Sequence, residues 1–154
     1  MTGVQTCALP IYPDTLTTRA NIAAWTGYCG DPAAALRLLI ELLPDQVRVL
    51  GTDHPNTLAT RNNIAAWTGN LGESAEGLCL SGLLLPHQQR VLGADHPDTL
   101  TTRNNIAAWT GASGDSAEAL RLFRLLLPHQ QRVLGADHPN TLATRNNIAA
   151  WTGT

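Results

Sequence analysis

The sequence predicts an all-α fold, a right-handed superhelical solenoid of antiparallel helix pairs, and three observations lead to that expectation. A sixteen-residue segment that begins at His54 recurs letter for letter at His138, and variant copies begin at Tyr12 and His96. The four copies are spaced by 42 residues. Proline is the second residue of every copy. A fixed period of this size is typical of solenoids, in which each repeat buries its apolar face against its neighbours.

The period divides the chain into repeats at 12–53, 54–95 and 96–137 and a partial repeat at 138–154. We therefore expect about three and a half repeats with seven helices. Residues 1–11 share no pattern with the corresponding segment 43–53, and they resemble the conceptual translation of a sequencing adapter. We interpret them as a non-native leader, either an artefact or disordered, and we expect the chain to be a fragment of a longer array.

The first helix of each repeat is expected to begin at its proline. In the repeat 96–137, Pro97 suits the first helical position, where its missing N–H costs nothing. We expect this helix over 98–110, because Gly111 and Gly114 follow it as breakers. Because the motif recurs every 42 residues, we expect an equivalent helix in each of the other repeats.

The second helix of each repeat is expected after a polar corner. Asp115 and Glu118 have the spacing of a capping box, in which both side chains satisfy early backbone N–H groups. Seven apolar residues between positions 119 and 127 then provide a broad packing face. Pro128 lies inside this helix and predicts either a kink or a restart as a short helix that ends near Leu134.

Composition excludes several classes of function. A net charge of -2 argues against nucleic acid or an anionic membrane as the partner, because both select basic surfaces. The three cysteines show no metal-ligand or CxxC spacing, which indicates reduced thiols in a cytoplasmic protein. No apolar run approaches the roughly 18 residues of a membrane span. The absence of lysine among ten basic residues suggests a GC-rich, bacterial gene.

Two antiparallel helices per unit, with Ala107 and Ala119 where they cross, resemble the tetratricopeptide repeat. The 42-residue period and the motif HPDTL…NNIA…G…EAL…F…VLGADHP are most similar to the kinesin light chain type, which in bacteria also forms C-terminal arrays of signal-transducing ATPases. The resemblance covers 12–154 and implies a protein-interaction scaffold. The chain departs from the family at a recurring threonine where an aromatic is usual (Thr26, Thr68, Thr110) and at a recurring arginine where an aliphatic residue is usual (Arg19, Arg61, Arg103, Arg145).

One side of each first helix is expected to face a ligand. Thr101, Asn105 and Ala108 lie opposite the side that meets the second helix. In the resembled family this side lines a concave groove, and asparagines there bind the backbone of an extended peptide through their amide donors and acceptors. The resemblance implies a groove set (Asn21, Asn63, Asn105, Asn147) and an edge set (Asn62, Asn104, Asn146). The alternative role for both sets is hydrogen bonding between adjacent helices.

Three other recurring features each have two interpretations. The tryptophans (Trp25, Trp67, Trp109, Trp151) either pack between repeats, which we favour, or stack on a ligand. The recurring arginines either snorkel or pair with an acidic residue, which we favour, or bind a ligand carboxylate. The Asp-His pairs that begin at Asp53, Asp95 and Asp137 lie one repeat apart, roughly 10 Å, which is too far for shared metal coordination. We expect them to cap helices.

Taken together, the sequence predicts a scaffold that binds an extended peptide or protein segment in its concave groove, within a larger regulatory protein. The alternative is a structural array that packs against other domains of its own chain, or self-associates through its exposed last helix, without an external ligand. The motifs GxxxxGK[ST], HExxH and GxSxG do not occur. We therefore expect no catalytic residues, no metal and no cofactor.

Overall fold

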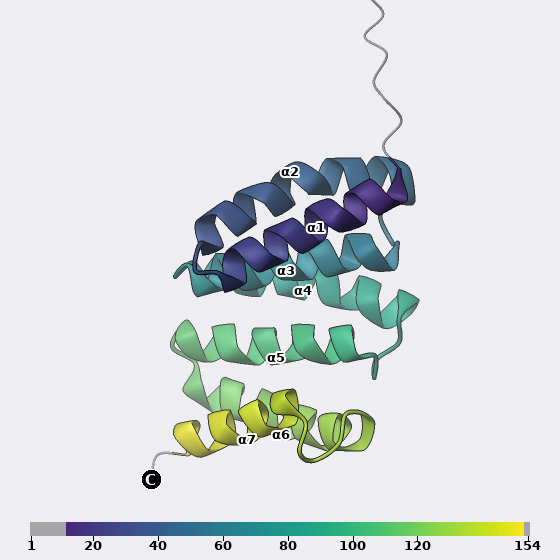
Figure 1. The fold of residues 1–154 in the computed structure, drawn as a ribbon. Coiled ribbons are helices and arrows are strands. Elements are labelled where there is room, and N and C mark those ends of the chain that lie inside the picture. The colour runs from purple at the N-terminus through teal and green to yellow at the C-terminus, as the bar shows by residue number, and fades with distance from the viewer. Residues whose placement is uncertain (1–11, 153–154) are drawn as a thin grey trace, which may run out of the picture.

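The computed structural model describes residues 12–152, and the expected leader at 1–11 lies outside them. Seven helices stack in chain order within the described part (Figure 1). The first helices of the repeats, here called A helices, are α1 (Pro13–Tyr28), α3 (Pro55–Asn70), α5 (Pro97–Ala112) and α7 (Pro139–Trp151). The second, or B, helices are α2 (Pro32–Leu50), α4 (Ser74–Val91) and α6 (Ser116–Val133). These elements confirm the expected all-α solenoid of helix pairs.

The A helices begin as their sequence predicts. Each has proline at its start, and three are capped by the preceding histidine. The Nδ1 atoms of His54, His96 and His138 accept backbone N–H groups two residues on, at 3.1, 3.2 and 3.2 Å. Within residues 12–152, no cluster of His, Cys, Asp and Glu side chains could hold a metal ion. The hydrogen bonds of His54, His96 and His138 confirm that these histidines cap helices.

Two of the three B helices, α2 and α6, begin at an aspartate-capped corner, whereas Glu73 before α4 makes no side-chain cap. Asp115 Oδ1 accepts the N–H of Glu118 at 3.0 Å, and Asp31 caps α2 in the same way at 2.9 Å. The carboxylate of Glu118 instead accepts two hydrogen bonds from Arg121, at 2.7 and 2.6 Å. The capping expectation is confirmed for the aspartate and wrong for the glutamate, because the arginine one turn along competes for it.

The expected restart at the B-helix prolines is wrong, because α2, α4 and α6 each continue through their proline. Leu126 and Gln130 are buried on either side of Pro128. Packing of both turns against the neighbouring A helices holds the helix together despite the hydrogen bond that proline removes.

Tryptophan joins each repeat to the one before it. The rings of Trp67, Trp109 and Trp151 lie over glycines of the preceding A helix, at Gly27, Gly69 and Gly111, respectively. A Cβ atom on these glycines would come within 2.8, 2.8 and 2.7 Å of a ring carbon. This contact confirms inter-repeat packing for three of the four tryptophans. Trp25 of the first repeat is 68% exposed.

Gly69→Ala should therefore destabilise the array. Alanine favours a helix interior by about 1 kcal/mol over glycine. Overpacking against the ring of Trp109 costs about 1–3 kcal/mol, which outweighs that gain. Urea unfolding followed by tryptophan fluorescence measures the difference.

Gly82→Ala is the matched control, because an added Cβ at this α4 position meets no atom within 4 Å. It should stabilise the protein by about 1 kcal/mol through helix propensity alone. Equal stabilisation by both substitutions would show that the tryptophan contact does not constrain Gly69.

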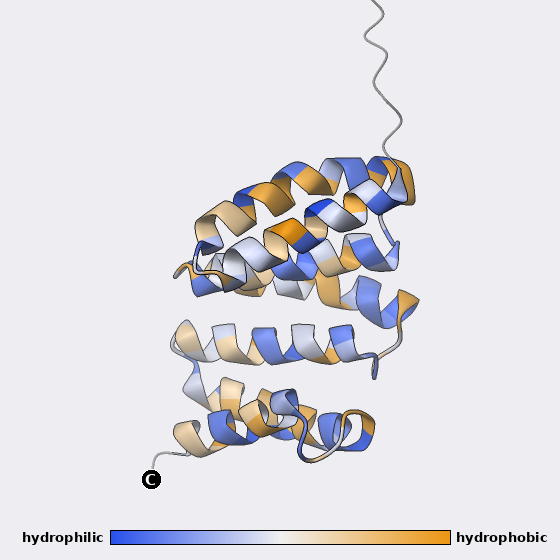
Figure 2. Cartoon of the chain, in the orientation of Figure 1, coloured by the Kyte–Doolittle hydropathy of each residue, from blue (hydrophilic) through white to orange (hydrophobic). Residues whose placement is uncertain are grey.

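The apolar core is built where A and B helices cross. Ala107, Ala119 and Phe123 are fully buried, and Leu122 and Ile148 pack against them. Figure 2 shows that hydrophobic and hydrophilic residues are interspersed along the helices, so that each contributes one face to the core. No helix in the described part of the chain combines the length and the hydropathy that a membrane crossing requires.

Candidate functional site

Two adjoining hollows lie between consecutive A helices and bring groove-set asparagines together. The first, of about 200 Å³, lies between α1 and α3 and includes Asn21 and Asn63. The second, of about 220 Å³, lies between α3 and α5 and includes Asn63 and Asn105. Asn63 thus belongs to both hollows. The side chains form a row along the A helices, with amide groups available to a segment that crosses them.

The members of the groove set differ in exposure. Asn21 is exposed on the first A helix, whereas Asn63 and Asn105 are half-buried at the two junctions. Asn147 is half-buried on α7. The junction residues therefore combine accessibility with restricted side-chain freedom, which lowers the entropy cost of binding.

Two asparagines of the edge set make hydrogen bonds between repeats. Asn62 Oδ1 accepts a hydrogen bond from Thr102 Oγ1 at 2.8 Å, and Asn104 Oδ1 accepts one from Thr144 Oγ1 at 3.1 Å. Each bond joins an A helix to the next A helix. This geometry supports the structural alternative for these two side chains, while Asn146 on α7 is exposed.

The first junction contains a polar group that the sequence pattern did not single out. Gln46 of α2 is only 1% exposed and lines the first hollow beside Asn21 and Asn63. Neither polar atom of its amide has a hydrogen-bond partner among the described protein residues. An unpaired buried polar group costs about 1–3 kcal/mol, so a group that reaches this amide recovers that energy. The available signal was the recurrence of glutamine at positions 46, 88 and 130.

Alanine at position 20 leaves this junction unlike the next two. Repeats two and three place Asn62 and Asn104 at the equivalent position, where they bond to the following helix. Ala20 cannot make such a bond, and it lines the first hollow. The first junction is thus bridged by fewer side-chain hydrogen bonds and has Gln46 within its lining.

The recurring arginines follow two patterns. Arg19 Nη1 lies 2.7 Å from Asp45 Oδ2, and this hydrogen bond lowers the pKa of the Asp45 carboxyl, with a smaller contribution from Arg48. The expected acidic partner is therefore confirmed for Arg19. Among the described residues, no acidic side chain lies within ion-pair distance of Arg61, Arg103 or Arg145.

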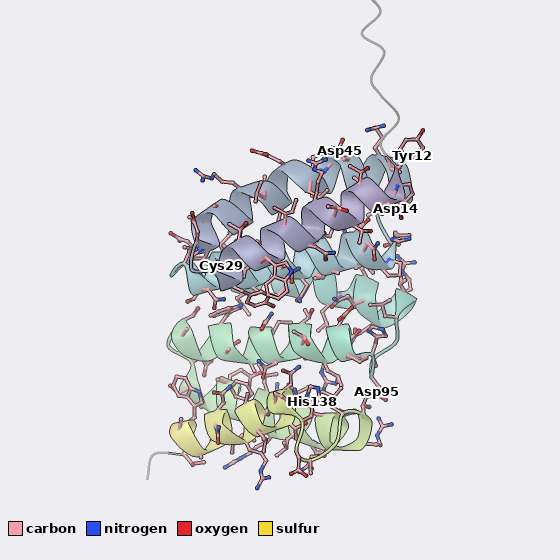
Figure 3. The ribbon with its side chains drawn as sticks, viewed as in Figure 1. Tyr12, Asp14, Cys29, Asp45, Asp95 and His138 are labelled. Atoms are coloured by element: carbon pink, nitrogen blue, oxygen red, sulfur yellow. The ribbon has the colours of Figure 1, made fainter. Side chains whose placement is uncertain are left out.

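The expectation that the Asp-His pairs cap helices is wrong for the aspartates of the first two pairs, which bind side chains of the following B helix instead and so clamp it. Asp53 Oδ2 accepts a hydrogen bond from Arg90 at 2.7 Å, and its Oδ1 lies 3.1 Å from His87 Nδ1. Asp95 has the same partners one period later, Arg132 and His129. Figure 3 shows Asp95 at the edge of the stack opposite to Cys29. In each clamp the arginine, and then the histidine, lowers the pKa of the aspartate.

These clamps should make stability depend on acid pH. Because the folded-state pKa of Asp95 lies below its unfolded value of about 3.9, its contribution is present above that pH and is lost as the pH falls through the folded pKa. Thermal unfolding of wild type and Asp95→Asn should therefore differ at about pH 7, and the difference should shrink as the pH falls below about 3.9. A difference that persists at the lower pH would show that the charge of Asp95 is not the cause.

Comparison with known proteins gives the same architecture. The sequence profile of the tetratricopeptide repeat matches residues 15–56 and 99–140. A comparison with curated proteins finds no match. One similar solved structure is described as the nearly identical TPR-like repeats of a kinesin light chain from Podosopora anserina. Its sequence is 25% identical to this chain, and the two structures superpose with a TM-score of 0.78 over 92% of this chain and 67% of that one.

A second solved structure, BtubC (BKLC) from P. vanneervenii, is 16% identical with a TM-score of 0.78. The match covers 93% of this chain and 57% of that one, and it shows the shared fold. Tetratricopeptide repeats are generally protein–protein interaction scaffolds and are typically non-enzymatic. With matched repeats over more than half of its length, the chain belongs to the tetratricopeptide repeat family.

Proposed function

We propose that this array binds an extended peptide segment of a protein partner across its A helices, as the interaction arm of a larger cytoplasmic regulatory protein. The peptide backbone lies across the two hollows and exchanges hydrogen bonds with the groove-set amides. In this proposal Asn147 binds the peptide at the far end of the row, whereas Asn62 and Asn104 hold adjacent A helices together.

Gln46 is the observation that carries this proposal. Its buried amide lacks a protein partner within residues 12–152, and it lines a hollow with two groove-set asparagines. A peptide C=O and N–H match the donors and the acceptor of these amides without a requirement for a particular side chain. The second hollow continues the same pattern with Asn105.

Selection from a random peptide library displayed on phage tests the proposal. The full 154-residue chain serves as bait, and the dissociation constant of each selected peptide is measured by fluorescence anisotropy. Gln46→Leu keeps the approximate side-chain volume and removes the amide. This variant should weaken binding of the selected peptides about tenfold, in line with the loss of one hydrogen bond to a buried group. Unchanged affinity would contradict a role for the first hollow.

The structural alternative has its own supporting observation. Trp25, Tyr28 and Ile22 on α1 are all more than half exposed, at 68%, 75% and 53%. Apolar surface of this kind is suited to another repeat, another domain or a second copy. An array that selects no peptide and sediments as a concentration-dependent dimer, with dissociation on Trp25→Ala, would favour this alternative.

A further inference from the structure

A separate apolar cavity lies between two B helices and the A helix beneath them. It has a volume of about 310 Å³, and its walls are aliphatic side chains of α2, α3 and α4. The aliphatic residues are Leu43, Ile64, Leu80, Leu83 and Leu84. This volume lies at the lower end of the range for small-molecule sites, which are mostly apolar with a few polar groups that fix orientation.

The cavity faces away from the proposed peptide groove. Arg61 lines the cavity and Asn63 lines both groove hollows. Two positions apart on one helix, their side chains point about 200° apart around its axis. A ligand in this cavity would therefore be distinct from a peptide across the A helices.

The polar groups of the cavity are Arg61 and His87. His87 Nδ1 is already engaged with Asp53. Arg61 is half-buried, and among the described residues no acidic side chain lies within ion-pair distance of it. A guanidinium stays charged and presents planar donors that fit a carboxylate. The cavity thus combines aliphatic walls with one cation that lacks a counter-charge.

The equivalent arginine of repeat one has an acidic partner. Arg19, one period before Arg61, bonds to the carboxylate of Asp45 at 2.7 Å. The residue one period after Asp45 is His87, so repeat two lacks that carboxylate. The apolar wall differs in the same way, since Glu41 of repeat one is replaced by Leu83, which is 68% exposed. Repeat two therefore lacks two carboxylates that repeat one has, and it presents a histidine and a leucine there, as repeat three does at His129 and Leu125.

From this comparison we infer that the cavity binds an aliphatic monocarboxylate. The ligand carboxylate takes the place beside Arg61 that the Asp45 carboxylate takes beside Arg19, and the aliphatic chain lies against Leu80, Leu83 and Leu84. Charge and apolar contact are both required, so neither an alcohol nor a short polar acid is an equivalent ligand.

Titration of the full chain with octanoate tests the inference, with octan-1-ol as the uncharged probe. Isothermal titration calorimetry should show saturable octanoate binding and at least about tenfold weaker octanol binding. Arg61→Gln should weaken octanoate binding by about the same factor and leave octanol binding unchanged. Arg19→Gln removes the equivalent side chain one period earlier and should leave octanoate binding unchanged.

A second variant tests the same claim without removing Arg61. The double substitution His87→Asp with Asp53→Asn places a carboxylate where repeat one has Asp45, and it avoids two adjacent aspartates. This protein should fold as wild type by circular dichroism. It should bind octanoate at least about tenfold more weakly, because the introduced carboxylate already occupies the place beside Arg61.

Three results would overturn the inference: no saturable octanoate binding, equal binding of octanoate and octanol, or octanoate binding that neither Arg61→Gln nor the double substitution weakens. In the first case, binding of N-acetyl-leucyl-leucine would point to a peptide C-terminus instead. Peptide selection on the groove is independent of all these outcomes, because its contacts lie on the other side of the A helices.

Discussion

Phe123→Ala should lower the free energy of unfolding by about 3–5 kcal/mol. The Phe123 side chain is fully buried among Ala107, Ala119, Leu122 and Ile148, at the junction of α5, α6 and α7. Its neighbours include small alanines that cannot extend into the space left behind, so the cost of a cavity adds to the loss of apolar burial. Because each repeat contacts only its neighbours, a loss of this size should detach α6 and α7 before the rest unfolds.

Hydrogen exchange and urea unfolding measure the two parts of this prediction. Amides of α6 and α7 should exchange faster in Phe123→Ala, while those of α1 and α2 keep their protection. Phe123→Leu is the control that retains most of the apolar volume, and it should cost less. Uniform loss of protection over all described helices would show that the array unfolds as one unit.

Repeat two provides a natural comparison for this site. Ser81 stands one period before Phe123 and is also fully buried, with no hydrogen-bond partner for its hydroxyl among the described residues. Gly77 precedes it, where a Cβ would lie 3.0 Å from the Cα of Gly69. Helix α4 thus approaches α3 closely without a large side chain, and its core contribution is smaller than that of α6.

The double substitution Asn63→Ala with Asn105→Ala should abolish binding of a selected peptide, with a loss of about a hundredfold or more. Each lost amide leaves a buried peptide group unpaired, at a cost of about 1–3 kcal/mol, and 1.4 kcal/mol corresponds to a factor of ten. Neither asparagine makes a side-chain hydrogen bond to another described residue, so helicity should change little. Fluorescence anisotropy and circular dichroism measure the two quantities.

Asn104→Ala is the matched control for that experiment, because Asn62 also lines the second hollow. Asn104 lies next to Asn105 in sequence but bonds to Thr144 of the following helix. Its removal should lower stability by about 1 kcal/mol and leave peptide affinity largely intact. The reverse pattern, with affinity lost only in this control, would transfer the binding role from the groove set to the edge set.

The fold was predictable because its signals are local and repeated. These signals act through backbone groups within a few residues: proline at each A-helix start, histidine before three of the four A helices, aspartate before α2 and α6, and glycine after the helices. Because the motif recurs with a fixed period, each local inference applied to every repeat. Continuity through Pro128 was not predictable in this way, because it depends on packing of both flanking turns against other helices.

The candidate site was less predictable because its decisive features are contacts between repeats. The sequence placed Asn62 and Asn63 on neighbouring positions, but only the structure shows that Asn62 is bound to Thr102 at the edge of the second hollow, whereas Asn63 lines both hollows. Gln46 lies on a B helix and reaches the A-helix hollow, which a view of one helix face does not reveal. The unpaired state of Arg61 likewise depends on what the neighbouring B helix places beside it.

A crystal structure of the full chain with a selected peptide tests the central claim most directly. We expect an extended peptide across α1, α3 and α5, with its backbone hydrogen-bonded to the side-chain amides of Asn63 and Asn105 and one group reaching Gln46. A peptide bound on the B-helix side, or at the exposed end of α1 around Trp25, would contradict the proposed groove.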